Sequence, residues 1–480
     1  MAGVLMPIAS LPSDDGVGSL GRSAYQLVDF LNDTGFRLWQ VLPLNPLGYG
    51  NSPYQPFSSF AGDELYIDLD LLADEGYLPQ KRKKLRKKKR IDYEAARAHK
   101  LPYLKEAFKE FDRQGREKEE FEQFCKQDWV YHYAVFIALK KNNDLRCWNE
   151  WPKDQQDWII DQKFDISPFE EEIRFQMFLQ YEFLKQWKLL KEYANKKDIL
   201  MVGDIPFYVG IDSLDVWEDR DSFLLDQDGQ PSFVAGVPPD YFSPEGQRWG
   251  NPIYNWDKLE QDGFRFWMQR LEYTAALYDI IRIDHFRAFD TYWKVPSSCK
   301  TAIDGEWIEA PGYALFDTLF ASMPDLWIVA EDLGDLRPEV LELRDYYNLA
   351  GMIVAEFDLF KDDDTVNKVI YTGTHDNQTV VGWYNSLKPA ERKKVDQHLR
   401  KEGTKDKNIT YRMLHYVLNA PANIAIIPLM DLLGLDDSAR LNTPATLGSP
   451  NWEWQLKDME ELEAQRTGIR RMLRYSKRLA

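Results

Sequence analysis

The sequence predicts an α/β fold, a TIM (β/α)8 barrel with large insertions that include a mainly helical subdomain. Eight short apolar runs recur along the 480-residue chain, and each ends at a polar or turn residue. Their length and continuous hydrophobicity are typical of parallel strands that are buried on both faces. Helical patterns, such as residues 23–36 and 264–278, separate runs of this kind. Eight strand-then-helix units favour a closed parallel barrel.

The predicted strands are unevenly spaced, which indicates insertions in a single barrel domain over residues 1–480. The apolar runs begin at Val4, Phe36, Ile199, Tyr278, Leu326, Gly351, Val369 and Ala422. Residues 77–197 are charged and rich in helical patterns, which predicts a helical insertion subdomain between the second and third strands. Residues 213–258 are rich in Pro, Gly and aromatic residues and poor in helix signals, which predicts a second, irregular insertion.

The amino-acid composition indicates which kinds of binding partner and which cellular compartment to expect. The formal net charge is −18, which argues against nucleic acid as the main partner because phosphate neutralisation needs a basic surface. The three cysteines form no CxxC pattern, which fits a reducing compartment without a disulfide framework or a structural zinc site. No apolar stretch is long enough to span a bilayer, and the N-terminus lacks signal-peptide features. We expect a soluble, cytoplasmic protein with no membrane partner.

Two compositional features admit more than one interpretation. Aromatic residues make up 14% of the chain; most are expected in the core, and a sugar-binding cleft would use others, because rings stack on pyranose faces. Within the segment Lys81–Arg90, nine of ten residues are basic. Such runs bind nucleic acid or direct nuclear import in some proteins. In a strongly acidic protein, a solvated surface segment is the favoured interpretation.

Polar residues gather at the ends of the predicted strands, which is where TIM barrels place catalytic groups. In chain order they are Asp204, Arg282, Asp284, His285, Glu331, Asp332, Glu356, His375, Asp376 and Asn377. Carboxylates on so many strand ends are more typical of a glycosidase than of a dehydrogenase or a phosphate-transfer enzyme. No GxGxxG or Walker motif indicates a nucleotide, and no ligand spacing indicates a metal, so we expect no cofactor.

The residue types fit the two-carboxylate chemistry of glycoside cleavage. Arg282 and Asp284 are two residues apart on a strand and face the same side, where the arginine favours the ionised carboxylate that a nucleophile requires. A structural ion pair is an equal alternative for this pair alone. Glu331 and Glu356 each follow an apolar run that would raise the carboxyl pKa, as a general acid requires, and the pattern does not choose between them. Asp376 is placed to bond sugar hydroxyls, whereas a lone His375 is more often a core histidine.

At these residues the chain resembles the amylomaltases, the 4-alpha-glucanotransferases or disproportionating enzymes of glycoside hydrolase family 77. The resemblance runs nearly end to end. Seven motifs occur in the family's order: PIASLPSDDGVGSLG, WQVLPLNPLGYGNSPYQPFSSFAG, GDIPFYV, GQRWGNPIYNW, RIDHFRAF, VAEDLG and GTHDNQT. Seven motifs in the same order make it improbable that the resemblance arises by chance or reflects another glycosidase family.

The resemblance implies roles by position. Asp284 in RIDHF matches the nucleophile, Glu331 in VAEDLG the acid/base, and Asp376 in THDN the transition-state stabiliser. The positions that match substrate-binding residues are Asp204, Arg282, His285 and His375 around the reactive glucose, Gln247 and Trp249 in a loop over the cleft, and Ser52 and Tyr54 on the acceptor side. The chain departs from the usual pattern at Ala288, Glu356 and Ala445.

The resemblance therefore implies an enzyme that transfers a segment of an α-1,4-glucan to the 4-hydroxyl of another glucan or of glucose. The implied route is a retaining double displacement, with maltooligosaccharides as donors and the loop DYFSPEGQRWGNP as a lid that excludes water. The expected assembly is a monomer or weak homodimer. An α-1,4-glucan hydrolase on the same barrel is the first alternative, and a glucan-binding protein without turnover is the second.

Overall fold

The computed structural model describes residues 1–480 except residues 87, 240–242, 335, 362–366, 405 and 480. Its centre is a parallel sheet in the order β10-β11-β12-β1-β2-β3-β6-β9. The strands are β1 Ala2–Leu5, β2 Leu38–Gln40, β3 Leu200–Ile205, β6 Ile280–Ile283, β9 Ile328–Ala330, β10 Gly351–Val354, β11 Lys368–Tyr371 and β12 Ile424–Pro428. A parallel bridge between Val329 and Ala350 joins the two ends of this order. The predicted barrel and all eight of its strands are confirmed.

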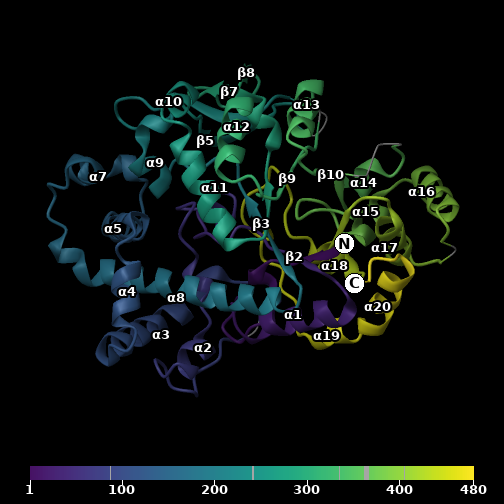
Figure 1. The fold of residues 1–480 in the computed structure, drawn as a ribbon, viewed down its shortest axis with the longest axis horizontal. Helices are drawn as coiled ribbons and strands as arrows, with labels where there is room; N and C mark the ends of the chain where they lie inside the picture. The colour runs from purple at the N-terminus through teal and green to yellow at the C-terminus, as the bar shows by residue number, and fades with distance from the viewer. Residues whose placement is uncertain (87, 240–242, 335, 362–366, 405, 480) are drawn as a thin grey trace.

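Helices surround the barrel between its strands (Figure 1). They include α1 Arg22–Thr34, α11 Arg265–Leu277, α12 Gly312–Ser322, α13 Pro338–Tyr346, α14 Ala355–Asp358, α15 Val380–Ser386, α16 Pro389–Lys401, α17 Ile409–Asn419, α18 Leu429–Leu432, α19 Glu460–Glu463 and α20 Arg466–Tyr475. Helix α1 illustrates why the sequence forms a helix at this position and why the helix ends where it does. One face buries Leu27, Val28 and Leu31, and the helix ends at Gly35, whose φ of 98° suits a residue without a side chain.

The stretch between β2 and β3 is helical, as predicted. It contains α2 Leu69–Asp74, α3 Tyr93–Gln114, α4 Lys118–Phe124, α5 Asp128–Asn142, α6 Lys153–Gln156, α7 Trp158–Asp161 and α8 Glu170–Asn195. Helix α8 has 26 residues and packs against α5 within this stretch and against α1 and β3 of the barrel. It therefore belongs to both parts of the molecule and ties the inserted helices to the barrel wall.

A second sheet corrects the expectation of an irregular insertion over residues 213–258. Strands β4 Phe233–Val237 and β5 Gln247–Pro252 pair with β7 Thr291–Pro296 and β8 Glu306–Glu309 in the antiparallel order β5-β4-β7-β8. The short helices α9 Leu214–Glu218 and α10 Trp256–Gln261 flank the first two strands. Pro and Gly residues mask these strands in the sequence, because they also signal turns and loops. The sheet fixes the segment around residue 249 beside the barrel mouth.

The basic run is tied to neighbouring acidic and carbonyl groups rather than left free. Lys84 pairs with Asp14 at 2.5 Å, and Arg82 pairs with Asp70. Leu85 donates its backbone N–H to the Asp14 carbonyl at 2.8 Å, which fixes the run against the loop after β1. These contacts agree with the interpretation of a surface segment, and residue 87 of the run lies outside the described residues.

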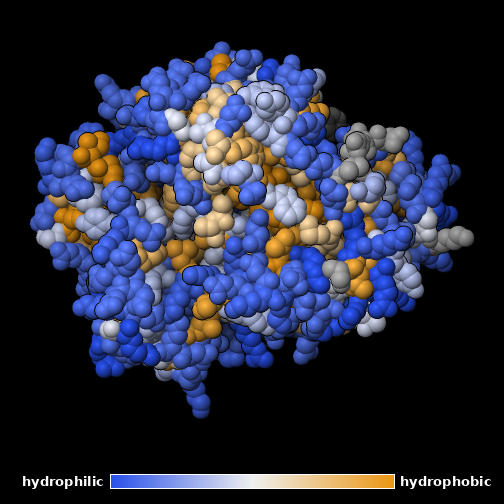
Figure 2. All heavy atoms as spheres, in the orientation of Figure 1, coloured by the Kyte–Doolittle hydropathy of each residue, from blue (hydrophilic) through white to orange (hydrophobic). Residues whose placement is uncertain are grey.

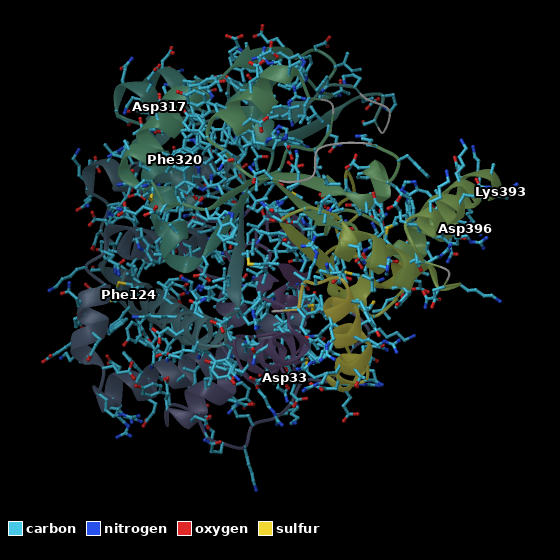
Figure 3. The ribbon with its side chains drawn as sticks, turned by 45° about the vertical axis from the view of Figure 1, so that its right-hand side comes forward. Asp33, Phe124, Asp317, Phe320, Lys393 and Asp396 are labelled. Carbon is cyan, nitrogen blue, oxygen red and sulfur yellow. The ribbon has the colours of Figure 1, made fainter. Side chains whose placement is uncertain are left out.

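The face of the molecule seen in Figure 2 is mainly hydrophilic. Figure 2 shows hydrophilic side chains over most of one face, with hydrophobic side chains gathered above α11 and α12. In Figure 3, Lys393 and Asp396 of α16 lie at the outer edge, far from Asp317 and Phe320 of α12. No helix among the described residues has the length and apolar character to cross a membrane.

Candidate active site

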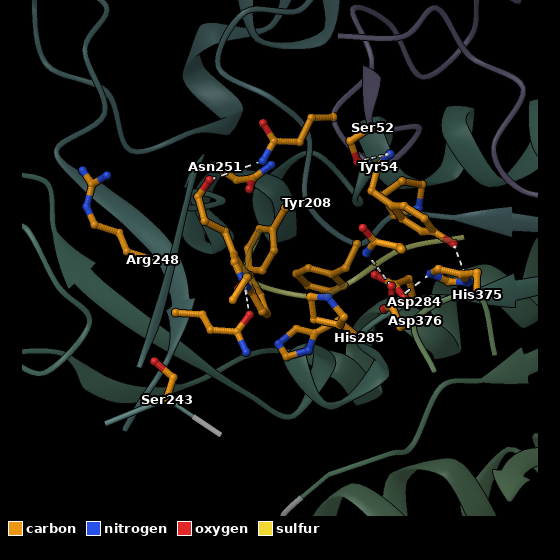
Figure 4. A pocket seen from close by; sticks show the side chains of 18 of the residues that line it. Ser52, Tyr54, Tyr208, Ser243, Arg248, Asn251, Asp284, His285, His375 and Asp376 are labelled. Carbon is orange, nitrogen blue, oxygen red and sulfur yellow. Dashed lines mark hydrogen bonds and ion pairs between the residues drawn. The ribbon is translucent and has the colours of Figure 1, made fainter. Parts of the chain in front are cut away.

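A cavity of about 560 Å³ lies at the carboxyl ends of the barrel strands. Asp284, His285, His375 and Asp376 line it, together with Ser52, Tyr54, Gln247, Trp249, Asn442 and Trp452 (Figure 4). A second cavity, of about 610 Å³, shares Gln247, Trp249 and His285 with the first and is lined by Glu331. The predicted site residues are therefore brought together at the expected end of the barrel.

Asp284 lies one residue beyond β6, where the strand register fixes its neighbours. Asp204 on β3 pairs directly with Arg282 on β6, so the two side chains share a face of the sheet. Arg282 bonds Asp204 at 2.6 Å and lies 3.1 Å from the Asp284 carboxylate. Burial raises the pKa of Asp284, and the Arg282 guanidinium opposes this rise by favouring the charged form. Arg282, held in place by Asp204, thus puts one fixed positive charge beside the partly exposed Asp284 carboxylate.

Glu331 follows β9, the neighbour of β6, and lies next to Asp284 in the sheet. Its backbone N–H donates to the Ile283 carbonyl at 3.0 Å, and its carboxylate accepts the backbone N–H of His285 at 2.7 Å. Burial and the negative charge of Asp284 raise the pKa of Glu331 to about 8. A carboxyl group with this pKa is largely protonated at neutral pH, as a general acid requires.

His285 connects the two cavities. Its φ of 51° places it in the left-handed region, and its ring meets Trp249 edge to face with centroids 4.9 Å apart. Burial and the nearby Arg287 lower the pKa of His285 to about 3, so the imidazole is neutral. Its Nε2 is buried and has no hydrogen-bond partner among the described residues.

Asp376 follows β11, and its surroundings keep it charged. Asn442 donates to its carboxylate at 2.7 Å, and His375 Nε2 lies 3.5 Å away. Burial acts to raise the pKa of Asp376, but His375 and Asn442 outweigh it and hold the pKa at about 2. Asp376 therefore carries a full negative charge at neutral pH.

Tyr54 forms one wall of the first cavity. Its hydroxyl donates to Asp204 at 2.7 Å, and its ring stacks on His375 with centroids 4.9 Å apart and planes 20° apart. Ser52 accepts the Tyr54 backbone N–H at 3.3 Å. The resemblance implies an acceptor-side position for Tyr54; in the structure Tyr54 contacts Asp204 and His375 and lines the same cavity as Asp284 and Asp376. The β5 residues Gln247 and Trp249 bond each other at 3.3 Å and stand between the cavities.

Two strand-end carboxylates do not face either cavity. Asp332 is buried and bonded by Arg344, by Lys368 at 2.8 Å and by the Met352 backbone N–H at 2.6 Å, so its role is structural. Glu356 is also buried. Burial and the carboxylates of Asp431 and Asp437 raise its pKa to about 9. Glu331 and not Glu356 therefore stands beside Asp284.

Sequence reasoning missed two residues that shape the cavity. Asn442 bonds Asp376, and Trp452, with φ of 66°, has its ring 5.9 Å from that of Tyr54 and 5.8 Å from that of His375. Both lie on a loop after β12 rather than at a strand end, so a search of strand ends does not find them. No group of three or more His, Cys, Asp or Glu side chains in the described part of the chain is arranged to hold a metal ion.

Comparisons with known proteins agree with this geometry. Residues 6–461 match the glycoside hydrolase family 77 model described as 4-alpha-glucanotransferase. The chain is 41% identical to the 4-alpha-glucanotransferase of Thermus thermophilus over 99% of each chain. It is 41% identical to that of Synechocystis over 95% of this chain and 93% of the other.

A solved structure of an amylomaltase from Streptococcus agalactiae, in complex with acarbose, has a TM-score of 0.94 to this fold. The two chains are 35% identical, and the match covers 100% of this chain and 99% of the other. The barrel, the site at its carboxyl face and the full-length matches lead to one conclusion: this chain belongs to the 4-alpha-glucanotransferases of glycoside hydrolase family 77 and acts on α-1,4-glucans.

Proposed function

We propose that Asp284 is the nucleophile, Glu331 the acid/base and Asp376 the transition-state stabiliser of a retaining double displacement. The observation that supports this most directly is the difference in protonation between the carboxyl groups of the two cavities. Glu331 has its pKa raised to about 8, whereas Asp376 has a pKa of about 2. Arg282, at 3.1 Å, supplies positive charge to Asp284. One protonated acid beside a charged carboxylate is what glycosidic cleavage requires.

In the first half of the reaction, Asp284 attacks the anomeric carbon of the donor sugar. The glycosidic bond breaks, its oxygen takes the Glu331 proton, and the donor segment is held as an ester on Asp284. Positive charge develops on the sugar ring in the transition state, and the Asp376 carboxylate stabilises it. Tyr54 and His375 provide a stacked wall for the reactive glucose, and His285 provides a neutral imidazole for a hydroxyl.

In the second half, the 4-hydroxyl of an acceptor gives its proton to Glu331 and attacks the anomeric carbon of the glycosyl ester. The Asp284 carboxylate leaves, and a new α-1,4 bond forms with retained configuration. We propose that glucose and glucans both act as acceptors. The proposed lid contributes by shielding the ester from water, and its strand residues Gln247 and Trp249 already stand over the site. Tyr241 and Phe242, two of the three aromatic residues of that loop, lie outside the described residues.

We further propose that residues 1–480 form one catalytic unit with the helical insertion at residues 77–197 and the lid-bearing insertion at residues 213–258. We also propose that the enzyme works in the cytoplasm as a monomer or weak homodimer. All three proposed catalytic residues come from one chain, and the three cysteines are free. Sedimentation at catalytic concentrations tests the assembly: a stable higher oligomer would contradict it.

The direct test is incubation with maltotriose. We expect glucose and longer oligosaccharides to form while total reducing ends stay constant, because each bond broken is replaced by a new bond. Chromatography with a reducing-end assay measures both quantities. Rising reducing ends with only shorter products would identify a hydrolase, which the family membership does not favour.

Replacement of the nucleophile provides the first prediction. Asp284→Asn removes the group that forms the ester and should lower turnover by at least about 10⁴-fold, as for other nucleophile deletions. Acarbose binding, followed by calorimetry, should persist because the sugar-binding walls remain. A variant that retains more than about one-hundredth of the activity would contradict the role of Asp284.

A further inference from the structure

The second cavity lies on the side of the site where the acceptor must stand. Glu331 lines this cavity, whereas Asp284 and Asp376 line the first. In the proposed mechanism, the acid/base touches the glycosidic oxygen, so the sugar on its far side is the leaving group and later the acceptor. The cavity of about 610 Å³ falls within the usual range for sites that bury small ligands. This volume has space for a second sugar beyond the one that forms the bond.

The outer part of this cavity presents an indole ring. Trp307 lies on β8 and has 40% of its surface exposed. The Arg287 guanidinium packs over its ring at 4.0 Å, and Trp293, directly paired with it on β7, contacts it edge to face at 5.1 Å. Two neighbours thus hold the ring in place, so a ligand that stacks on it loses little additional side-chain entropy. The carbon-bound hydrogens of a glucose ring are a natural partner for such a face.

Polar groups flank this ring within the same cavity. Arg337 lines the cavity and is held by Asp290 through two hydrogen bonds of 2.6 and 2.7 Å. Its side chain is 36% exposed, and Glu309 and Glu339 lie 3.8 and 3.7 Å from the guanidinium. Pro238 and Pro239 supply an apolar wall. An aromatic face with a fixed donor beside it is the usual composition of a sugar subsite.

We propose that Trp307, held by Arg287, binds the second sugar of the acceptor chain and makes maltose and longer glucans better acceptors than glucose. This inference rests on the proposed function, because Glu331 must be the acid/base for the cavity to be the acceptor side. Glucose fills only the position next to Glu331 and does not reach Trp307. Maltose gains the contact with the indole, and the gain shows as a lower KM for the acceptor.

The experiment uses maltotriosyl fluoride as donor and glucose or maltose as acceptor. Fluoride release above the acceptor-free rate reports transfer. For the native enzyme, kcat/KM for maltose should exceed that for glucose by about 10-fold, as expected for one good aromatic contact. Trp307→Ala should remove most of this ratio by raising the KM for maltose, with glucose parameters within about twofold of the native values. Trp307→Phe should retain an intermediate ratio.

Trp327→Ala is the matched control, because Trp327 is 39% exposed and lines neither cavity. It should leave the maltose-to-glucose ratio unchanged. The inference is overturned if Trp307→Ala keeps the native ratio, or if it weakens glucose and maltose equally. If the native enzyme shows no acceptor-dependent fluoride release, the proposed function itself fails, which is a distinguishable result.

Discussion

At the scale of single residues, the site keeps its carboxyl groups in different charge states. Burial and Asp284 raise the pKa of Glu331 to about 8, whereas His375 and Asn442 hold that of Asp376 at about 2. The sequence shows which acids end a strand, and this was enough to identify Asp284, Glu331 and Asp376 as candidates. It did not separate Glu331 from Glu356, because both follow similar apolar runs and only their three-dimensional neighbours differ.

The charge state of Glu331 predicts the alkaline side of the pH profile. Glu331 must be protonated to assist departure of the leaving sugar, and its protonated form is lost as pH rises through about 8. We expect kcat/KM for an oligosaccharide donor to fall above this pH. Glu331→Gln should lower that rate by about 10²- to 10⁴-fold and remove the alkaline limb. Fluoride release from a glycosyl fluoride, which needs no protonation, should fall much less; an equal loss would argue against the acid role.

Glu356 predicts a pH dependence of stability. Its pKa is raised to about 9 in the folded protein, so between about pH 4.5 and 9 the folded state holds a proton that the unfolded state releases. The free energy of unfolding therefore decreases as pH rises through this window. Glu356→Gln keeps a neutral side chain and removes this loss, so its melting temperature should exceed the native value by at least about 2 °C at pH 8. At pH 4 the difference should vanish, and an equal shift at both pH values would refute the cause.

At the scale of elements, the barrel strands position the chemistry through their register. Strands β3, β6 and β9 are neighbours: Asp204 is in register with Arg282, and Asp284 and Glu331 directly follow the paired ends of β6 and β9. All eight barrel strands could be predicted, because strands buried on both faces are continuously apolar. The antiparallel sheet could not, because β5 contains Gly250 and Pro252 and β8 is mostly exposed and charged, so neither shows a buried-strand pattern.

The packing of β3 predicts that the protein loses stability when Gly203 is replaced by a larger residue. Gly203 precedes Asp204, and a side-chain carbon added at this position would overlap the Tyr278 ring. Gly203→Ala should therefore destabilise the protein by about 1–3 kcal/mol through overpacking. Gly468→Ala is the control, because nothing lies within 4 Å of the added carbon in helix α20. It should be neutral or stabilise by up to about 1 kcal/mol. Chemical denaturation measures both, and equal effects would contradict the packing argument.

At the scale of the whole molecule, the inserted helices reach the active site through the loop after β12. Tyr93 at the start of α3 donates to the Trp452 carbonyl at 2.7 Å, and Ile91 donates its backbone N–H to Glu453 at 2.8 Å. Trp452 in turn lies beside Tyr54 and His375. The helical content of the insertion could be read from its sequence. Its contact with the cavity wall could not, because residues 93 and 452 are far apart along the chain.

This contact predicts an effect of a remote substitution on donor binding. Tyr93→Phe removes the donor to a buried carbonyl and should cost about 1–2 kcal/mol of stability. Because Trp452 is then held less firmly, KM for maltotriose should rise about threefold with kcat nearly unchanged, a change of less than 1 kcal/mol. Tyr131→Phe, at a position with 36% exposure outside the cavity, should change neither quantity. An unchanged KM in Tyr93→Phe would show that the insertion does not support the donor wall.

The contact that closes the barrel, between β9 and β10, is the part of the barrel where we expect thermal unfolding to begin. Among the described residues, β9 is joined to the residue before β10 by the bridge between Val329 and Ala350. The Ala330 N–H donates one backbone hydrogen bond to the Ala350 carbonyl there, at 2.8 Å. The other strand neighbours share ladders of three or four residue pairs. Regions with fewer backbone bonds open first on warming. Because Glu331 directly follows β9, we expect thermal opening of this seam to displace the proposed acid/base while most of the helices remain folded, so that activity is lost before secondary structure.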